Sequence, residues 1–327
     1  MSRVLLGLIS AVLAFALSGC GGLAAGAGDE SDADPGRPAK TPARAQQPTP
    51  EPTKPPLEVA DLLGTDGRLT VLILGSDARE GVIGARTDTI IVASIDPGSG
   101  KVAMVSLPRD TVNVPIAPGN AYAGRINGLF WEFERATGKT REALRKTKEA
   151  LAYAFDIEID YYAMLEFDGL VRLVNGIGGV TVTLDEPLVD TSMRIGGKGL
   201  KLKAGKRALD GKTALAFSRS RHSDSDYERA SRQQQVIAAA AEKVRSRGLG
   251  ALPSLVELVS RKSVTDIPLR AAPALFGLAL KAKLASPKSI VLAPGRWARE
   301  SPGTYTITPR VLEVQKMFDK VFNPLDS

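Results

Sequence analysis

Two neighbouring apolar segments joined by a turn constrain the fold of this 327-residue chain more than any other feature. Thr87–Ile95 and residues 101–107 are rich in β-branched and aliphatic side chains, and the sequence DPGSG at 96–100 between them is typical of a tight turn. We therefore predict a β-hairpin. A third apolar run, residues 69–75, is predicted to be a buried strand that precedes the hairpin.

The rest of the chain alternates helix and strand signals without an internal repeat. Apolar spacing predicts helices over Thr140–Phe155 and residues 168–175, 210–217, 227–245, 271–284 and 309–322. Short strands are predicted over Val180–Leu184 and residues 160–166 and 289–293. This irregular alternation, with at least one hairpin, indicates a single α/β domain in which helices pack on a mixed central β-sheet.

The first twenty residues differ in composition from the remainder. A basic residue, Arg3, precedes an apolar run that ends in Leu-Ser-Gly-Cys, and Cys20 is the only cysteine of the chain. Residues 1–20 are therefore typical of a lipoprotein signal peptide with Cys20 as the lipidated residue; an uncleaved anchor with an unused cysteine is the alternative. Residues 21–65 are rich in Pro, Ala and Gly and are predicted to be a disordered linker, which the folded domain follows at 66–327.

The predicted export limits the partners of this basic chain, whose formal net charge is +7 at pH 7. A protein exported to the outer face of the bacterial cytoplasmic membrane does not meet genomic DNA. In addition, no aromatic residues alternate with the basic ones to stack on bases. We therefore expect no nucleic acid partner. Membrane headgroups, phosphorylated wall polymers and lipid-linked phosphates are the anionic partners that remain.

Arginines gather where the long helix at 227–245 is predicted to begin. The cluster comprises Arg219, Arg221, Arg229 and Arg232, with Gln233 on the same helix face as the last two. Arginines oppose the dipole at a helix N-terminus, where free amides already attract anions, so we predict a cradle for phosphate or pyrophosphate. The alternative is a solvated loop in which they pair with Asp224, Asp226 and Glu228. Arg221 and Arg229 are both expected to face the surface.

Charged residues also stand at the ends of the first three predicted strands. These residues are Asp77, Arg86, Asp88, Arg109 and Asp110. If the second and third strands form the hairpin, the last four of these residues lie together at its open end. They can form an ion-pair network or, because carboxylate oxygens bind Mg²⁺ that in turn bridges phosphate oxygens, a Mg²⁺ and phosphate site.

Six segments, in this order and spacing, resemble the LytR-CpsA-Psr family. They are ARTDTIIVASID, VSLPRD, RIN at 125–127, FDGLVRLVNGIGGVTV, LDGKTALAFSRSR, and D-x-x-R-x-x-R-Q-Q at 226–234. The resemblance implies a mixed-sheet α/β fold with an apolar pocket for a polyprenyl chain. It also implies a Mg²⁺-dependent phosphotransferase that moves a glycopolymer phosphate from a polyprenyl-pyrophosphate carrier to peptidoglycan, forming a phosphodiester.

The resemblance assigns roles to individual residues. Asp88 matches the metal-binding aspartate, and Asp77 is a candidate second ligand. The matching pyrophosphate-binding residues are Arg109, Arg219, Arg221, Arg229 and Arg232, with Arg86 and Gln233 in support. Asp226 is the candidate base for the proton of the acceptor hydroxyl, or else a residue that orients the arginines. Together with Arg109 and Arg221, it makes up the predicted catalytic set.

The chain departs from the family pattern in three places. Glu228 stands where the family usually carries Gly, the RIN segment continues as GLFWEFERATG, and a lipobox replaces the membrane helix of many members. Two alternatives to the transferase therefore stay open: a pyrophosphatase that uses water, and a lipoprotein that only binds lipid pyrophosphates. A Ser-His-Asp hydrolase is disfavoured, because His222 has no G-x-S-x-G partner. We interpret His222 as a loop residue or an auxiliary phosphate contact.

Overall fold

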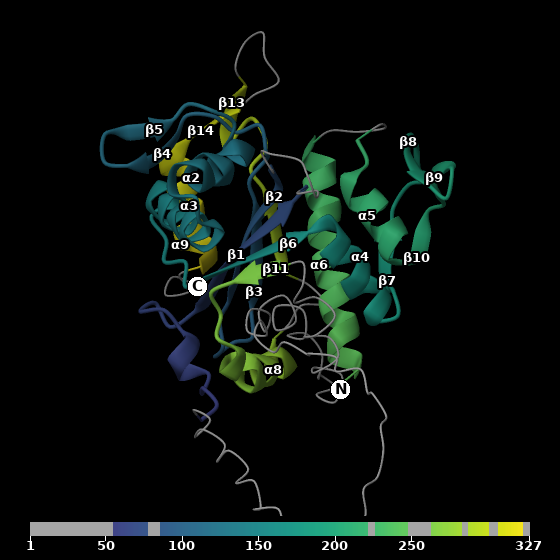
Figure 1. Cartoon of the computed structure of the whole chain (residues 1–327), viewed down its shortest axis with the longest axis horizontal. Coiled ribbons are helices and arrows are strands. Elements are labelled where there is room, and N and C mark those ends of the chain that lie inside the picture. Colours follow the sequence, from purple (N-terminus) through teal and green to yellow (C-terminus); the bar gives the residue numbers. More distant parts are fainter. Residues whose placement is uncertain are drawn as a thin grey trace, which may run out of the picture.

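A six-stranded mixed β-sheet forms the centre of the molecule (Figure 1). The structure, a computed structural model, describes residues 55–77, 86–221, 226–247, 263–282, 287–300 and 307–322. In spatial order the strands are β11 (Ser263–Thr265), β6 (Tyr161–Glu166), β1 (Leu69–Ser76), β2 (Thr87–Ile95), β3 (Val102–Ser106) and β12 (Lys288–Val291). β1, β2 and β3 are antiparallel neighbours, whereas β6 pairs with β1 and β12 pairs with β3 in parallel. The predicted hairpin and the mixed sheet are confirmed.

Helices cover both faces of this sheet (Figure 1). Side chains alternate between the faces along a strand, so Leu72 and Leu74 of β1 pack on one side and Val71 and Ile73 on the other. The first side is covered by α2 (Leu129–Thr137), α3 (Thr140–Phe155) and α9 (Val311–Phe322). The second side is covered by α4 (Phe167–Gly176), α5 (Gly211–Arg219), α6 (Asp226–Arg247) and α8 (Ala272–Lys281). Burial on both faces explains why β1 and β2 are continuous apolar runs in the sequence.

Two-stranded ribbons surround the central sheet, and the sequence predicted only one of their strands, β7. In the described part of the chain they are β4 (Val114–Ala117) with β5 (Asn120–Tyr122), β7 (Val180–Leu184) with β10 (Gly205–Leu209), β8 (Leu188–Ile195) with β9 (Lys198–Leu202), and β13 (Ala298–Glu300) with β14 (Ile307–Pro309). Short 3-10 turns are η1 (Ala60–Leu62), η2 (Ile126–Gly128) and η4 (Leu269–Ala271). The α4–α6 side of the molecule therefore carries two ribbons in addition to its helices (Figure 1).

The folded part begins earlier than the sequence predicted. Leu62, which was assigned to the linker, is 1% exposed and belongs to the core. The amide of Leu57 donates to the carbonyl oxygen of Arg270 at 3.1 Å. The predicted linker end at residue 65 is therefore wrong, because apolar residues in this segment pack on the domain. The signal peptide and Cys20 lie outside the described residues. Within the described ranges, no helix combines the length and apolar character that a membrane span requires.

Asp160, just before β6, is expected to make the stability of the domain depend on pH. Burial raises the pKa of its carboxyl from 3.8 to about 7; the hydrogen bond from the Thr70 amide opposes this shift and the nearby carboxylate of Glu158 adds to it. The folded chain therefore holds a proton that the unfolded chain releases. Relative to an Asp160→Asn variant, the free energy of unfolding of the wild type should fall as pH rises from about 4 to about 7, then stay level. Urea unfolding of both proteins across this range measures the difference, and a relative gain in stability with pH would contradict the assignment.

Candidate functional site

The open end of the β2–β3 hairpin brings Asp88 and Arg109 together. Asp88 is the second residue of β2, and Arg109 follows the end of β3. Arg109 Nη1 donates to Asp88 Oδ2 at 3.0 Å, and the side-chain amide of Asn127 donates to Asp88 Oδ1 at 3.0 Å. Beside them, Arg125 Nη1 lies 3.1 Å from Asp110 Oδ1. The RIN segment therefore contributes Arg125 and Asn127 to the same charged cluster.

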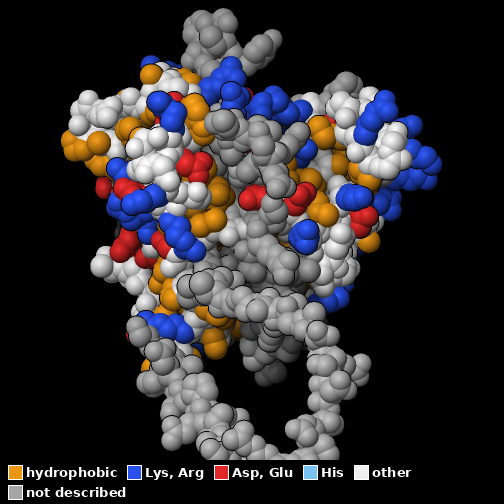
Figure 2. Space-filling model, in the orientation of Figure 1, with side chains coloured by type: hydrophobic (Ala, Val, Ile, Leu, Met, Phe, Trp, Pro, Cys, Tyr) orange, Lys and Arg blue, Asp and Glu red, His pale blue; other side chains and the backbone are white. Residues whose placement is uncertain are grey.

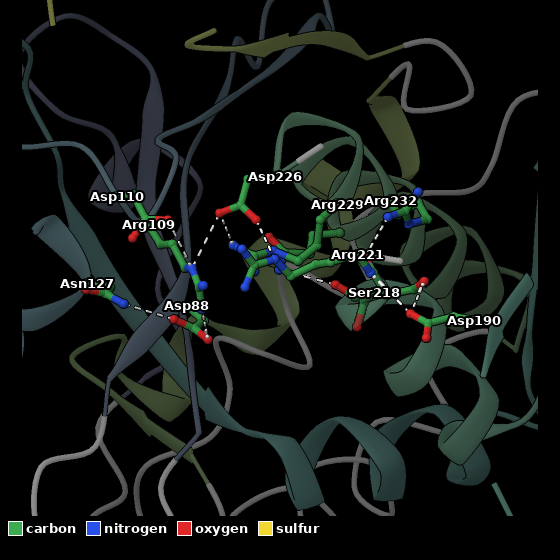
Figure 3. Close-up of polar contacts among 12 residues, drawn as sticks. Asp88, Arg109, Asp110, Asn127, Asp190, Ser218, Arg221, Asp226, Arg229 and Arg232 are labelled. Atoms are coloured by element: carbon green, nitrogen blue, oxygen red, sulfur yellow. Dashed lines mark hydrogen bonds and ion pairs between the residues drawn. The ribbon is translucent and has the colours of Figure 1, made fainter. Parts of the chain in front are cut away.

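Asp226 lies at the centre of this cluster (Figure 3). It is the first residue of α6, where a carboxylate interacts favourably with the helix dipole. Its carboxylate lies 3.4 Å from Arg109 Nε, 2.6 Å from Arg221 Nε and 3.2 Å from Arg229 Nη2. Guanidinium groups from three places in the chain therefore meet one carboxylate: the end of β3, the α5–α6 connection and α6.

Two of these arginines have buried donors without an acceptor. Arg109 Nε lies 3.4 Å from carboxylate oxygens of Asp110 and Asp226 but is hydrogen-bonded to neither. Arg229 is 4% exposed, and its Nε has no hydrogen-bond acceptor among the described residues. Leaving a buried donor unpaired is costly. Both arginines therefore retain hydrogen-bonding capacity that the described residues do not meet.

Burial and charge have different net effects on the two arginines. Burial lowers the pKa of Arg229, and Asp226 opposes the shift. Burial also acts to lower the pKa of Arg109, but the three surrounding aspartates outweigh it and raise that pKa above its ordinary value. Both groups remain cationic at any physiological pH. Beside them, burial and nearby carboxylates raise the pKa of Tyr227 to about 12, so its hydroxyl stays protonated.

A cavity of about 220 Å³ lies against this cluster. Its charged end is formed by Asp88, Arg109, Arg219, Arg221 and Arg229, and its apolar walls come from β1, β6, α4, α5 and α6. One face of α6 joins the two parts, because Arg229, Gln233, Val236, Ile237 and Ala240 all line the cavity at helical spacing. A cationic end beside an apolar interior suits an amphiphile with an anionic head.

Comparison with known proteins places the chain in a family. Residues 36–319 match the model of the LytR_cpsA_psr family. The chain belongs to this family. The match spans most of the described residues and confirms the resemblance that the six sequence segments carry.

Several relatives in the LytR_cpsA_psr family have names that state an activity. The polyisoprenyl-teichoic acid–peptidoglycan teichoic acid transferase TagU of Oceanobacillus iheyensis is 30% identical over 65% of this chain and 63% of its own. TagT of Bacillus subtilis, named for the same activity, is 31% identical over 63% of this chain and 62% of its own. The cell wall biosynthesis protein LcpA of Corynebacterium glutamicum is 28% identical over 64% of this chain and 46% of its own. The chain thus spans less than two thirds of the length of these relatives.

Solved structures of related proteins share the fold. TagT bound to LIIa-WTA superposes with a TM-score of 0.60 at 27% identity, over 80% of this chain and 92% of that one. The crystal structure of B. subtilis TagV superposes with a TM-score of 0.64 at 23% identity, over 80% of this chain and 99% of that one. The α/β architecture with a mixed central sheet is therefore that of the LytR_cpsA_psr family.

The structure brings most of the predicted site residues of this LytR_cpsA_psr protein together. The residues that line the cavity are Asp88, Arg109, Arg219, Arg221, Arg229 and Gln233. Asp226 is not a lining residue, but it contacts three arginines that are. The Arg219 guanidinium lies over the ring of Phe167, 4.5 Å from its centroid, which holds the charge at the cavity wall.

Arg232 does not line the cavity and has a different role from the one predicted. It is 7% exposed; its Nε donates to the carbonyl oxygen of Phe217 at 3.1 Å and its Nη2 to that of Ser220 at 2.6 Å. These carbonyl groups lie at the C-terminal end of α5, where helix carbonyls lack intrahelical partners. Arg232 therefore caps α5 in place of the predicted pyrophosphate contact.

Asp77 and Arg86 lie beside the site without lining the cavity. The Arg86 amide donates to Asp77 Oδ1 at 2.8 Å, and the Asp77 amide donates to the Arg86 carbonyl oxygen at 3.1 Å. The pair therefore closes the connection between β1 and β2. The structure gives no support to Asp77 as a metal ligand or to Arg86 as a phosphate contact.

Three further expectations can be compared with the structure. The side chain of Arg221 is 47% exposed, as expected, but the prediction that Arg229 faces the surface is wrong, because Arg229 is only 4% exposed and lines the cavity. Glu228 is exposed and does not line the cavity. His222 lies outside the described residues. Asn127 was given no role from the sequence, although its place in RIN is the signal that could have identified it.

A Mg²⁺ ion fits this site through Asp88. Mg²⁺ in phosphate-binding enzymes is often held by one or two carboxylates together with substrate phosphates and water. Each Asp88 oxygen accepts one hydrogen bond and keeps a further lone pair, and the side chain lines the cavity. Among the described residues, no group of three Asp, Glu, His or Cys side chains converges. The site therefore suits a Mg²⁺ ion that takes most of its ligands from phosphate oxygens and water, and does not suit an ion coordinated by protein side chains alone.

Proposed function

We propose that this protein transfers a glycopolymer phosphate from a polyprenyl-pyrophosphate carrier to peptidoglycan during cell-wall assembly. The observation that carries the proposal is the apolar cavity that ends at buried, unpaired arginine donors. A polyprenyl pyrophosphate has the complementary form, since it joins a hydrocarbon tail to a multiply charged head. The names of the teichoic acid transferases TagU and TagT support a polyisoprenyl-linked donor and a peptidoglycan acceptor.

In the proposed reaction the chain supplies position and charge. Arg109, Arg221 and Arg229 bind the phosphate oxygens through planar forks. An acceptor hydroxyl attacks the phosphorus that bears the glycopolymer, the bond from this phosphorus to the bridging oxygen breaks, and polyprenyl phosphate leaves. Asp226 accepts the hydroxyl proton. The product is a phosphodiester, and no covalent enzyme intermediate is needed.

A basic surface supports an anionic polymer as the cargo. Residues 191–209, in and between β8, β9 and β10, include six Lys or Arg and no Asp or Glu. Figure 2 shows basic side chains gathered over β8 and β9. Met193 of the same ribbon lines the cavity, so this surface adjoins the site. A positive surface beside a binding site attracts anionic ligands over long distances.

A reconstitution experiment tests the proposal and its two alternatives. The mature full chain is incubated in detergent with a polyprenyl-pyrophosphate-linked glycopolymer, Mg²⁺ and peptidoglycan oligomers. We expect polymer on the peptidoglycan product. Release of free polymer phosphate would instead identify a pyrophosphatase, and donor binding without either product would identify a binding protein.

We also propose that a lipid on Cys20 anchors the chain at the outer face of the cytoplasmic membrane.

A second experiment tests the proposed metal. Bound Mg²⁺ would neutralise charge on the phosphate oxygens and the leaving group. We expect chelation with EDTA to weaken wild-type binding of geranylgeranyl pyrophosphate by about tenfold, which corresponds to about 1.4 kcal/mol. In an Asp88→Asn variant the affinity should be the same with and without Mg²⁺. Asp77→Asn is the matched control and should keep the Mg²⁺ dependence; loss of that dependence in both variants would restore Asp77 as a ligand.

A further inference from the structure

Asp190 of β8 is a buried carboxylate without a cationic partner among the described residues. It is 0% exposed. Its Oδ1 accepts from the Ser192 amide at 2.9 Å, the Ser192 hydroxyl at 2.5 Å and the Met193 amide at 3.2 Å. Its Oδ2 accepts from the Ser220 hydroxyl at 2.7 Å and the Arg221 amide at 3.3 Å. Burying an ion costs free energy unless hydrogen bonds compensate it, and here hydroxyl and amide groups supply all of them.

The two oxygens of Asp190 brace two different borders of the cavity. Oδ1 holds the segment that carries Met193, which lines the cavity wall. Oδ2 holds the segment between Arg219 and Arg221, which both line its charged end. These segments are about 30 residues apart in the chain, and this side chain links them directly.

The local backbone is shaped to let Asp190 reach inward. The β8–β9 pairing is irregular between Asp190 and Arg194. Opposite this irregularity, a Cβ atom added to Gly199 would lie 2.8 Å from the Thr191 Cα, so the strands approach closely there because Gly199 has no side chain. The β8–β9 ribbon therefore places the Asp190 carboxylate at the C-terminal end of α5, where it accepts hydrogen bonds from Ser220 and Arg221.

Ser220 is held from a second side by α6. The Arg232 Nη2 group donates to the Ser220 carbonyl oxygen, and Asp190 accepts from the Ser220 hydroxyl. Ser220 is 0% exposed. The residue between the two cavity arginines is therefore fixed through both its side chain and its backbone.

We propose that Asp190 is a positioning residue that preorganises Arg219 and Arg221 for the pyrophosphate head of the lipid. This inference rests on the proposed function. Groups that are held in their binding geometry before the ligand arrives lose less conformational entropy on binding. Asp190 thereby improves the binding of an anion although it is itself an anion.

The sign of the effect separates positioning from simple electrostatics. Removing a negative charge from beside a phosphate site should strengthen phosphate binding if charge alone matters. If Asp190 positions the arginines, an Asp190→Asn variant should bind geranylgeranyl pyrophosphate about tenfold more weakly. Ser220→Ala removes the hydrogen bond from the Ser220 hydroxyl to Asp190 without a change of charge, and should weaken binding by about threefold.

The experiment compares these variants of the full chain with Glu186→Gln, which removes one charge from an exposed position just before β8. Calorimetric titration with geranylgeranyl pyrophosphate gives affinities. Hydrogen exchange of peptides over residues 216–221 measures, without any ligand, how firmly Asp190 holds this segment. We expect weaker binding and exchange that is about tenfold faster for Asp190→Asn, and no change for Glu186→Gln.

Each outcome decides one point. Equal or tighter binding by Asp190→Asn and Ser220→Ala, with wild-type exchange, would overturn the inference while the proposed function stands. A wild type that does not bind the probe would overturn the proposed function, and hydrogen exchange would then still decide whether Asp190 holds the arginine segment. If Asp190→Asn does not fold, Ser220→Ala decides the inference.

Discussion

The Asp226→Asn variant is expected to lower kcat for transfer by about 10² to 10⁴, the usual contribution of a general base, with little change in KM. Asp226 contacts Arg109, Arg221 and Arg229 together. An asparagine keeps the shape and one acceptor oxygen for the guanidinium groups, but it cannot take the proton of the acceptor hydroxyl. Loss of one negative charge beside the phosphates does not weaken donor binding. Steady-state kinetics with separate variation of donor and acceptor measure both constants.

Asp110→Asn is the matched control for this change. Asp110 belongs to the same cluster, 3.4 Å from Arg109 and 3.1 Å from the half-exposed Arg125. It contacts neither Arg221 nor Arg229, so we expect its replacement to lower kcat by less than about tenfold. A rise in KM at constant kcat in Asp226→Asn would identify Asp226 as an orienting residue. Unchanged kinetics would exclude both roles.

The Arg229→Met variant is expected to bind geranylgeranyl pyrophosphate at least about 30-fold more weakly, a loss of about 2 kcal/mol or more. Arg229 is 4% exposed, lines the cavity and has a buried Nε donor without an acceptor among the described residues. Methionine is of similar length and apolar, so it fills the space but removes the charge and the fork. Binding is measured by calorimetry at fixed Mg²⁺.

Because Arg229 is buried, its replacement also tests the fold. The variant leaves Asp226 with two cationic neighbours, so its thermal unfolding temperature should fall by a few degrees. Arg229→Lys restores the charge and should recover most of this stability without recovering the bidentate contact. Arg125→Met, in which a half-exposed arginine outside the cavity lining is replaced, should keep wild-type affinity. Equal loss of affinity in Arg125→Met would show that bulk charge alone decides binding.

The sequence predicted the central sheet well because local signals and tertiary burial agree there. The apolar runs of β1 and β2 are buried on both faces, and the turn at 96–100 fixes the antiparallel pairing of β2 with β3. That pairing alone brings Asp88 near Arg109, as observed. The site was therefore predictable wherever one local element sets the distance between its residues.

The sequence failed where long-range packing decides the direction of a side chain. Arg229 and Arg232 share a face of α6, but Arg229 lines the cavity and Arg232 turns to the carbonyl groups at the end of α5. No spacing rule distinguishes them, because α5 and α6 meet only in the folded chain. Strands β8, β9 and β10 were missed for a related reason: each is partly exposed and carries Lys or Arg, which weakens the strand pattern.

The single face of α6 that lines the cavity from Arg229 to Ala240 has a consequence for the evolution of selectivity. In the proposed complex this one helix contacts both the charged head and the hydrocarbon tail of the donor. A rotation or shift of α6 that accommodates a different tail also displaces Arg229, which is proposed to bind the head. Relatives that change their lipid carrier are therefore expected to change both ends of α6 together, whereas a change of polymer, which projects away from it, leaves this helix untouched.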